Sequence, residues 1–346
     1  MKATWKKYTL HFKQPSGTSR GILRTKDSYF ILLEDSGKHG IGECGILKGL
    51  SADDRPDYEV KLNWLMENIN EPLAELYGAL MEFPSIQAGL EMALLDMEAK
   101  DHVLFPSGFT EGKATQPING LIWMGDLEFM KKQVAQKLKD GFGVLKMKIG
   151  AINFEDEITI LKSIRNEFSA NELELRVDAN GAFFATEAID ILHRLAELKI
   201  HSIEQPIKKG QWQELASLCE APPIEIALDE ELIGVFTEAK KRELLRTIRP
   251  QHIILKPSFV GGFRGSEEWI QLTKEMHIGW WATSALESNI GLSAIAQWNF
   301  TKENKVPSGL GTGGLYTNNF ESPLYVKNGG IGYDPEGIWN ISNLSK

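Results

Sequence analysis

The sequence contains very little cysteine: Cys44 and Cys219 are the only two among its 346 residues. They are far apart and form no CxxC motif, so the sequence offers neither a disulfide framework nor a cysteine-based metal site. Basic residues are in the minority, with 38 lysines and arginines against 47 aspartates and glutamates. Because nucleic-acid binding requires a basic face, this balance argues against nucleic acid as the main partner, although it does not exclude a small anionic substrate.

Long apolar runs are also missing. No stretch approaches the ~18 apolar residues that span a bilayer, so we expect no membrane association. The first residues, MKATWKKYTLHFKQ, alternate apolar and polar side chains, which is typical of a strand and not of a signal peptide. Together these absences predict a cytoplasmic protein.

Residues 1 to about 115 are expected to form a small α+β capping domain. Alternating segments at residues 4–12 and 21–34 predict strands joined by the turn-rich loop QPSGTSR, and a third short piece, HGIGECG, follows. Apolar residues recur at helical spacing in residues 56–77 and 85–99. The tail, about residues 316–346, is rich in Asn, Gly and Pro and is expected to pack back on this domain.

Residues 116–315 follow a different, repeating sequence pattern. Polar residues that each close a short apolar run recur about every 25–30 residues, the length of a βα unit: Lys148, Asp178, Glu204, Asp229 and Lys256. This repetition predicts a (β/α) barrel, a modified TIM barrel, with PINGLIWM as its first strand, HIGWWATS as its seventh and a short eighth strand near KVPSGLG. Because the carboxyl ends of barrel strands meet at one mouth, these five side chains are expected to converge there.

Asp178, Glu204 and Asp229 offer only oxygen ligands. Hard oxygen donors favour Mg²⁺, or Mn²⁺, over Zn²⁺. Any one of these carboxylates could instead cap the following helix. Three of them at matching strand ends, with lysines on the strands at either side, favour a metal site whose remaining positions are open to substrate and water.

Lys146 and Lys148 have the same parity on one strand, so both should point into the barrel. A buried lysine is costly unless it faces a charged or catalytic site. Two ammonium groups near a divalent cation should lower each other's pKa, which makes Lys148 a candidate general base. Arg176 shares parity with Asp178 and should also face inward. Lys256 is expected across the barrel from Lys148, although a solvated strand end would explain it equally well in isolation.

The order and spacing of five motifs resemble the muconate lactonizing enzyme subgroup of the enolase superfamily: KxK at 146–148, DAN at 178–180, EQP at 204–206, DE at 229–230 and KP at 256–257. The resemblance covers nearly the whole chain and implies a capping domain ahead of the barrel. It implies that Asp178, Glu204 and Asp229 bind Mg²⁺, and that the two lysines, Lys148 and Lys256, flank a small carboxylate substrate. Asn180 and Glu230 of these motifs would support the site.

The stretch TSALESNIGLSAIAQW, after the seventh strand, is similar to the SxLESxxGL segment of o-succinylbenzoate synthases, and it departs at Thr283, where many have serine. The resemblance implies a Mg²⁺-dependent lyase that carries out the syn dehydration of 2-succinyl-6-hydroxy-2,4-cyclohexadiene-1-carboxylate in menaquinone biosynthesis. Ser284 and Glu287 would line the pocket or brace its lysines. Cap loops at residues 17–20 and 46–51 would close over the substrate.

Related activities remain open alternatives. A dipeptide epimerase or an N-acylamino acid racemase would use the same two lysines, but the region GLGTGGLYTNN lacks the acidic pair that epimerases usually carry for the substrate amine. A catalytically silent barrel that only binds a carboxylate is the non-enzymatic alternative. GLGTGG formally matches GxGxxG, but no helical pattern follows it, so a dinucleotide site is excluded. His201, His252 and His277 lie at strand starts, which argues against a histidine base.

Overall fold

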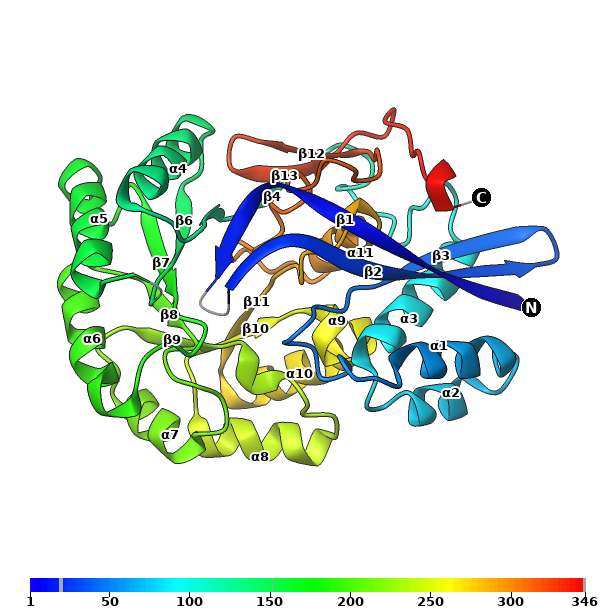
Figure 1. The fold of residues 1–346 in the computed structure, drawn as a ribbon, viewed down its shortest axis with the longest axis horizontal. Coiled ribbons are helices and arrows are strands. Elements are labelled where there is room, and N and C mark those ends of the chain that lie inside the picture. The colour runs from blue at the N-terminus through cyan, green and yellow to red at the C-terminus, as the bar shows by residue number, and fades with distance from the viewer. Residues whose placement is uncertain (19–20, 151, 345–346) are drawn as a thin grey trace.

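The computed structural model describes residues 1–18, 21–150 and 152–344, and it opens with an antiparallel sheet covered by helices (Figure 1). The sheet has the order β1-β2-β3, formed by β1 (Lys2–Thr18), β2 (Gly21–Asp35) and β3 (Lys38–Cys44). The helices are α1 (Tyr58–Glu67), α2 (Leu73–Ala79) and α3 (Pro84–Glu98). These elements form what we call the cap.

Helix α3 lies very close to β3 because glycines line their contact. A Cβ atom on Gly42 would lie 1.9 Å from the carbonyl oxygen of Gly89, and one on Gly40 would lie 2.1 Å from that of Ala93. Such distances are far shorter than any van der Waals contact. The short piece HGIGECG is therefore the edge of the cap sheet against which α3 docks.

The larger part of the chain is a parallel sheet of seven strands, in the order β11-β10-β9-β8-β7-β6-β5 within the described residues. Helices flank these strands in alternation along the chain (Figure 1). The strands are β5 (Gly120–Ile122), β6 (Val144–Lys148), β7 (Glu174–Asp178), β8 (Ser202–Glu204), β9 (Glu225–Leu228), β10 (His252–Leu255) and β11 (Gly279–Ala282). The helices are α4 (Leu127–Lys139), α5 (Phe154–Glu167), α6 (Ala185–Glu197), α7 (Trp212–Glu220), η1 (Glu230–Leu232), α8 (Glu238–Ile248), α9 (Pro257–Val260), α10 (Gly262–Met276) and α11 (Asn289–Phe300).

The eighth position of the barrel is held by two residues and not by a regular strand. Gly309 accepts a hydrogen bond from Ser284 N (3.1 Å) and donates one to Ala282 O (2.8 Å). On the other side, Ser308 accepts from Asn119 N (2.9 Å). The segment thus joins the β11 edge to the residues just before β5, and the short eighth strand expected near KVPSGLG is reduced to this bridge.

Side chains alternate between the two faces of the barrel strands, as a pleated backbone requires. On β6, Leu145 and Met147 belong to the hydrophobic core that the barrel strands share with the helices. Lys146 and Lys148, which alternate with them, form ion pairs with Asp178 of the neighbouring strand. The predicted parity of the two lysines is confirmed by these contacts.

The tail packs against the start of the barrel segment and against the cap. Strands β12 (Leu324–Lys327) and β13 (Gly330–Tyr333) form a hairpin that pairs with β4 (Gln116–Pro117), and η2 (Ser342–Leu344) follows. The rings of Phe320 and Phe30 lie 5.4 Å apart, which packs the tail against the cap. The boundaries proposed at residues 115 and 315 stay a prediction. Within the described residues, no helix has the length and apolar character needed to cross a membrane.

Candidate active site

The five periodic polar residues meet at one end of the barrel. Lys148, Asp178 and Glu204 are the last residues of β6, β7 and β8, and Asp229 and Lys256 directly follow β9 and β10. The parallel register places Lys148 opposite Asp178 and Asp178 opposite Glu204. Regular strand pairing therefore sets the spacing of these side chains.

Two lysines of β6 bind the same carboxylate oxygen. Lys146 Nζ donates to Asp178 Oδ2 (2.9 Å) and to Glu204 Oε2 (2.7 Å). Lys148 Nζ donates to Asp178 Oδ2 (2.7 Å) and to Asn180 Oδ1 (2.6 Å). The ammonium groups thus lie side by side and are held by one carboxylate between them.

The charges of this cluster perturb its proton equilibria. Burial would raise the pKa of Asp178, but the charges of Lys146 and Lys148 outweigh it and hold that pKa well below its usual range. Burial, and then the charge of Asp178, raise the pKa of Glu204. Burial would lower the pKa of Lys146, but the carboxylates of Asp178 and Glu204 raise it instead. The sequence argument weighed only the repulsion between cations, and the protein's carboxylates outweigh that repulsion at Lys146.

The second lysine of the site belongs to a separate ion pair. Lys256 Nζ donates a hydrogen bond to Asp229 Oδ2, and it lies 5.6 Å from the centre of the Phe259 ring. Burial opposes the charge of Lys256, but Asp229 and then Glu204 raise its pKa. This ammonium is therefore a fixed positive charge four strands away from Lys148.

Asn180 links the two halves of the site. Its backbone N–H donates to Asp178 Oδ1 (3.0 Å), and its Nδ2 donates to Glu230 Oε1 (2.9 Å). Asn180 has φ of 46°, a left-handed conformation that asparagine tolerates better than most residues. Burial and the charge of Asp229 raise the pKa of Glu230. The strained backbone aims the Asn180 amide at both Lys148 and Glu230.

The three carboxylates fit a hard divalent cation by chemistry, but here each of them is ion-paired with a lysine. One oxygen of Glu204, Oε1, is buried and has no hydrogen-bond partner among the described residues. A cation would satisfy this oxygen and favour the ionised form of a carboxyl group that burial disfavours. In the described part of the chain, Asp178, Glu204 and Asp229 do not each place one oxygen within 4.8 Å of the others. Binding therefore requires side-chain adjustment, with the cation replacing some of the ammonium contacts.

A cavity of about 500 Å³ opens above these residues. Lys146, Lys148, Asn180 and Lys256 line it on the barrel side, together with Ser284. The cap contributes Gly21–Leu23 and Leu47–Leu50, which include most of the loop predicted to cover the substrate. Of the other predicted loop, residues 19 and 20 lie outside the described residues. The volume suits a small organic ligand.

Glu287 braces two walls of this cavity. It is fully buried and accepts hydrogen bonds from Ser284 Oγ (2.6 Å) and Ser258 Oγ (2.6 Å). Ser284 lines the cavity, and Ser258 lies two residues after Lys256. Glu287 itself is not among the lining residues. Of the two roles expected for this pair, Ser284 therefore lines the cavity and Glu287 braces its walls.

Arg176 points inward as expected, but its partners are not those of the site. Its Nε donates to Glu174 Oε1 (2.7 Å), and its guanidinium lies 4.5 Å from the centre of the Trp281 ring. Glu174 begins β7, at the end of the strand away from Asp178. Arg176 is absent from the cavity lining. Parity predicted the correct face of the strand but could not give the depth of the guanidinium along the barrel.

Sequence reasoning missed Gln205 and two cavity lysines. Gln205 Oε1 accepts from the N–H groups of Asp229 and Glu231, both at 3.2 Å, so it holds the turn after β9. Its φ of 40° is a left-handed conformation that could not be read from the EQP motif. Lys48 and Lys137 also line the cavity, from the cap and from α4. The loop that contains Lys48 was expected over the substrate, but no role followed for this lysine from the sequence. Lys137 has no sequence signal, because only tertiary packing brings its helix to the cavity.

The chain matches the family described as Enolase C-terminal domain-like over residues 130–335. The matched segment covers more than half of the chain and contains all five periodic residues. This protein belongs to the enolase superfamily. The match begins inside α4 and ends just after β13, so it spans the barrel strands that carry the site.

Individual superfamily members resemble the whole chain. The o-succinylbenzoate synthase of Desulfotalea psychrophila is 45% identical over 96% of this chain and 99% of its own length. The solved structure of MenC from Desulfotalea psychrophila LSv54 has a TM-score of 0.85 and 41% identity, covering 96% of this chain and 99% of that one. The L-Ala-D/L-Glu epimerase of Bacillus subtilis is more distant, with 26% identity over 94% of this chain and 90% of its own.

Proposed function

We propose that this superfamily member is an o-succinylbenzoate synthase, a lyase that removes water from 2-succinyl-6-hydroxy-2,4-cyclohexadiene-1-carboxylate in menaquinone biosynthesis. One observation carries the proposal. The cavity is lined by five lysines (Lys48, Lys137, Lys146, Lys148 and Lys256), and no acidic side chain of the described residues lines it. The substrate carries two carboxylates and no ammonium group, so its charge complements this cavity.

The degree of similarity supports the same activity. The Desulfotalea synthase is 45% identical over nearly the full length of both chains, whereas the Bacillus epimerase is 26% identical. The match to the Desulfotalea synthase includes the cap. Since the cap supplies part of the cavity wall, the resemblance extends to the surface that would select the substrate.

Lys148 would carry the proton in both halves of the reaction. In its neutral form, its Nζ takes the proton from the ring carbon that bears the carboxylate, and the C–H electron pair moves into the ring. The carbon–oxygen bond to the 6-hydroxyl then breaks, and the departing hydroxide takes the same proton from Lys148 to leave as water. One base on one face therefore accounts for a syn elimination and returns to its starting state.

Lys256 would act as a fixed charge. Its pKa is raised by Asp229 and Glu204 against the effect of burial, which favours its cationic form. A cation on the face opposite Lys148 stabilises the negative charge that develops on the ring and carboxylate after proton removal. Asn180 would orient Lys148, because its Oδ1 accepts from Lys148 Nζ at 2.6 Å.

We propose that Asp178, Glu204 and Asp229 hold a divalent cation, Mg²⁺ or Mn²⁺. When bound, the cation supplies Lewis-acid stabilisation to the substrate carboxylate. The orphaned Glu204 Oε1 and the all-oxygen donor set support this assignment. Glu230, through Asn180, and Glu287, through its two serines, would keep the surrounding groups in place. The substrate and product are small charged molecules, and we propose that the reaction takes place in the cytoplasm.

Racemisation of an N-acylamino acid is the second candidate, because two lysines on opposite faces also suit a two-base exchange. Epimerisation of a dipeptide is disfavoured by the cavity itself. Gly309, Gly311, Thr312 and Leu315 line the region where an acidic pair would be needed for the substrate ammonium. An ammonium among lysines, with no carboxylate partner, would be buried at high cost.

The direct test is to incubate the purified protein and Mg²⁺ with the cyclohexadiene substrate and to follow aromatisation by ultraviolet absorbance. We expect rapid conversion, and we expect Lys148→Ala to abolish it while the circular dichroism spectrum stays unchanged. No conversion by the unaltered protein would reject the proposal, and binding of the carboxylate without turnover would favour the silent-barrel alternative.

A further inference from the structure

Three potential metal ligands gather at the amino ends of three adjacent barrel strands. His201 directly precedes β8, Glu225 is the first residue of β9, and His252 is the first residue of β10. The opposite ends of the same strands carry Glu204, Asp229 and Lys256, so this group lies at the far end of the barrel from the cavity. The proposed reaction uses none of the three.

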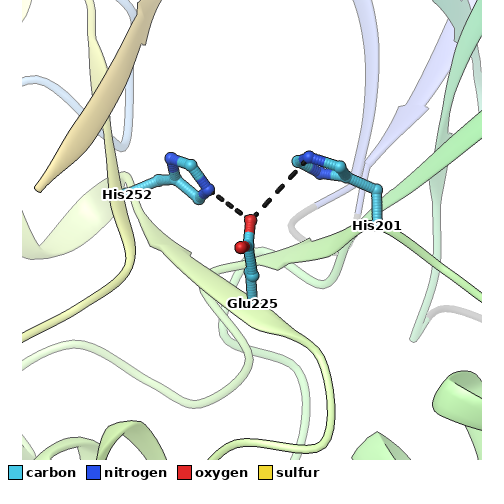
Figure 2. Close-up of side chains that lie close together, drawn as sticks. All are labelled: His201, Glu225 and His252. Atoms are coloured by element: carbon cyan, nitrogen blue, oxygen red, sulfur yellow. Dashed lines mark hydrogen bonds and ion pairs between the residues drawn. The ribbon is translucent and has the colours of Figure 1, made fainter.

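The side chains converge on one carboxylate oxygen (Figure 2). His252 Nε2 lies 2.5 Å from Glu225 Oε2, and His201 Nε2 lies 3.8 Å from the same oxygen. One ligand atom from each residue lies within 4.8 Å of the other two. Among the described histidines, cysteines, aspartates and glutamates, no other trio meets that distance.

We propose that His201, Glu225 and His252 form a second metal site, which binds a late first-row divalent cation such as Zn²⁺. Two imidazoles and a carboxylate are borderline ligands that suit Zn²⁺, unlike the all-oxygen set at the other end of the barrel. Three protein ligands leave a fourth tetrahedral position for water. This proposal is independent of the reaction assigned to the cavity.

The two histidine–carboxylate distances fit after a small movement of the exposed Glu225 side chain. Metal–ligand bonds of about 2.0–2.1 Å in a tetrahedral site place neighbouring ligand atoms about 3.3 Å apart. The His201–Glu225 distance of 3.8 Å is close to this value, and the His252–Glu225 distance of 2.5 Å has to open. The Glu225 side chain is 50% exposed and can rotate, whereas the strand backbones that carry the two rings need not move.

The surroundings prepare His201 for a metal. Its Nδ1 lies 3.0 Å from Ser202 Oγ and 4.0 Å from Glu174 Oε1, so an Nδ1–H would have acceptors within reach when Nε2 binds a metal. Such an outer partner is usual for metal-bound histidine.

His252 lacks such a partner. Its Nδ1 is buried and has no hydrogen bond within the described part of the chain, and a Cβ on Gly279 would lie 2.2 Å from it. Metal binding through Nε2 places the proton on this unpartnered nitrogen. Since a missing outer-shell partner typically weakens binding about 10–100-fold, we expect an affinity below that of structural zinc sites.

The test uses the full chain with Mg²⁺ in large excess, so that the all-oxygen site is saturated. Co²⁺ is titrated, and its tetrahedral d–d absorption bands are followed. Zn²⁺ is then added to displace Co²⁺. We expect one equivalent of tetrahedral Co²⁺ in the unaltered protein, and binding weakened about tenfold or more in His201→Gln, His252→Gln and Glu225→Gln. Glutamine at 252 can still donate to Glu225, so folding contacts are largely kept.

Two controls separate this site from others. His277→Asn removes a histidine near the start of β11, and asparagine suits the left-handed backbone there (φ of 57°), so the bands should not change. Asp178→Asn should also leave them unchanged. Zn²⁺-induced shifts of the His201 and His252 imidazole signals in the unaltered protein provide a test that needs no variant. Absence of tetrahedral bands and of these shifts, or full binding by His252→Gln, would overturn the proposal.

Discussion

Lys148 donates a 2.7 Å hydrogen bond to Asp178, the residue directly opposite it on the next strand. This pairing joins the candidate base to a candidate metal ligand without any loop between them. The strand register therefore fixes the position of the candidate base relative to the candidate metal ligand. The same Asp178 oxygen also accepts from Lys146, so a cation bound by Asp178 must compete with two ammonium groups.

Removing the metal should abolish turnover. Without a bound cation, the three carboxylates would repel the substrate carboxylate instead of stabilising it. Chelation should therefore stop aromatisation, and added Mg²⁺ or Mn²⁺ should restore it. Asp178→Asn should lose at least about a hundredfold in kcat/KM. Thermal unfolding of Asp178→Asn checks that the barrel is intact. Undiminished activity after exhaustive chelation would reject the metal site.

The barrel and the convergence of its polar residues were predictable because they depend on a repeat. Strand–helix units of similar length place Asp178, Glu204 and Asp229 at matching strand ends whatever the helices contain. The depth of Arg176, the left-handed turn at Gln205 and the cavity lysine Lys137 were not predictable. Each depends on contacts between elements that no local pattern encodes. At position eight the barrel closes through two isolated pairs of backbone hydrogen bonds, made by Ser308 and Gly309. Such a short segment has no alternating hydrophobic pattern in the sequence.

The two lysines should contribute unequally. Lys148→Ala removes the group that moves the proton twice, so its loss should exceed the ~10²–10⁴-fold typical of one general acid–base step. Lys256→Ala removes a fixed charge and should lower kcat with a smaller effect on KM. Steady-state rates give both values, and exposed Lys132→Gln is the matched control. Near-normal kcat in Lys148→Ala would contradict the assignment of the base.

Lys48 should help to hold the second carboxylate of the substrate. It lines the cavity from the cap loop, is exposed, and is therefore screened by solvent. We expect Lys48→Gln to raise KM a few-fold at low salt with little change in kcat, and the effect to shrink as ionic strength rises. Lys132→Gln, an exposed lysine outside the cavity, should change neither. A salt-independent loss of kcat would show that Lys48 acts in another way.

Gly42 should be irreplaceable in the cap. A Cβ at this position would lie 1.9 Å from Gly89 O, so Gly42→Ala must push α3 away from β3 and should cost about 1–3 kcal/mol in the free energy of unfolding. Gly78→Ala is the matched control, because a Cβ there meets nothing within 4 Å and it lies in helix α2. That variant should gain about 0.5–1 kcal/mol. Denaturant unfolding measures both, and equal stability of the two variants would contradict the close packing.

His102 should make stability depend on pH. Its Nδ1 lies 2.8 Å from Asp96 Oδ1, and this hydrogen bond raises the pKa of His102 against the effect of burial. The contribution is complete below the unfolded pKa of about 6.5 and is lost as pH rises through the higher folded pKa. With the ring 30% exposed, it is at most about 1 kcal/mol.

His102→Asn suits the local φ of 60° and removes the titration. The difference in the free energy of unfolding between the unaltered protein and this variant should therefore shrink from pH 6 to pH 9. A difference that is constant with pH would show that the imidazole does not titrate against Asp96.

The central claim is that Lys148 alone moves protons while Lys256 stays charged, and one measurement separates this from a two-base exchange. The protein is incubated in D₂O with the cyclohexadiene substrate, a dipeptide panel and an N-acylamino acid panel. Aromatisation is followed by ultraviolet absorbance and α-proton exchange by NMR. The account predicts rapid aromatisation, no exchange with dipeptides and at most slow exchange with N-acylamino acids. Rapid exchange with either panel, without aromatisation, would contradict it and make the protein a racemase or epimerase of the same superfamily.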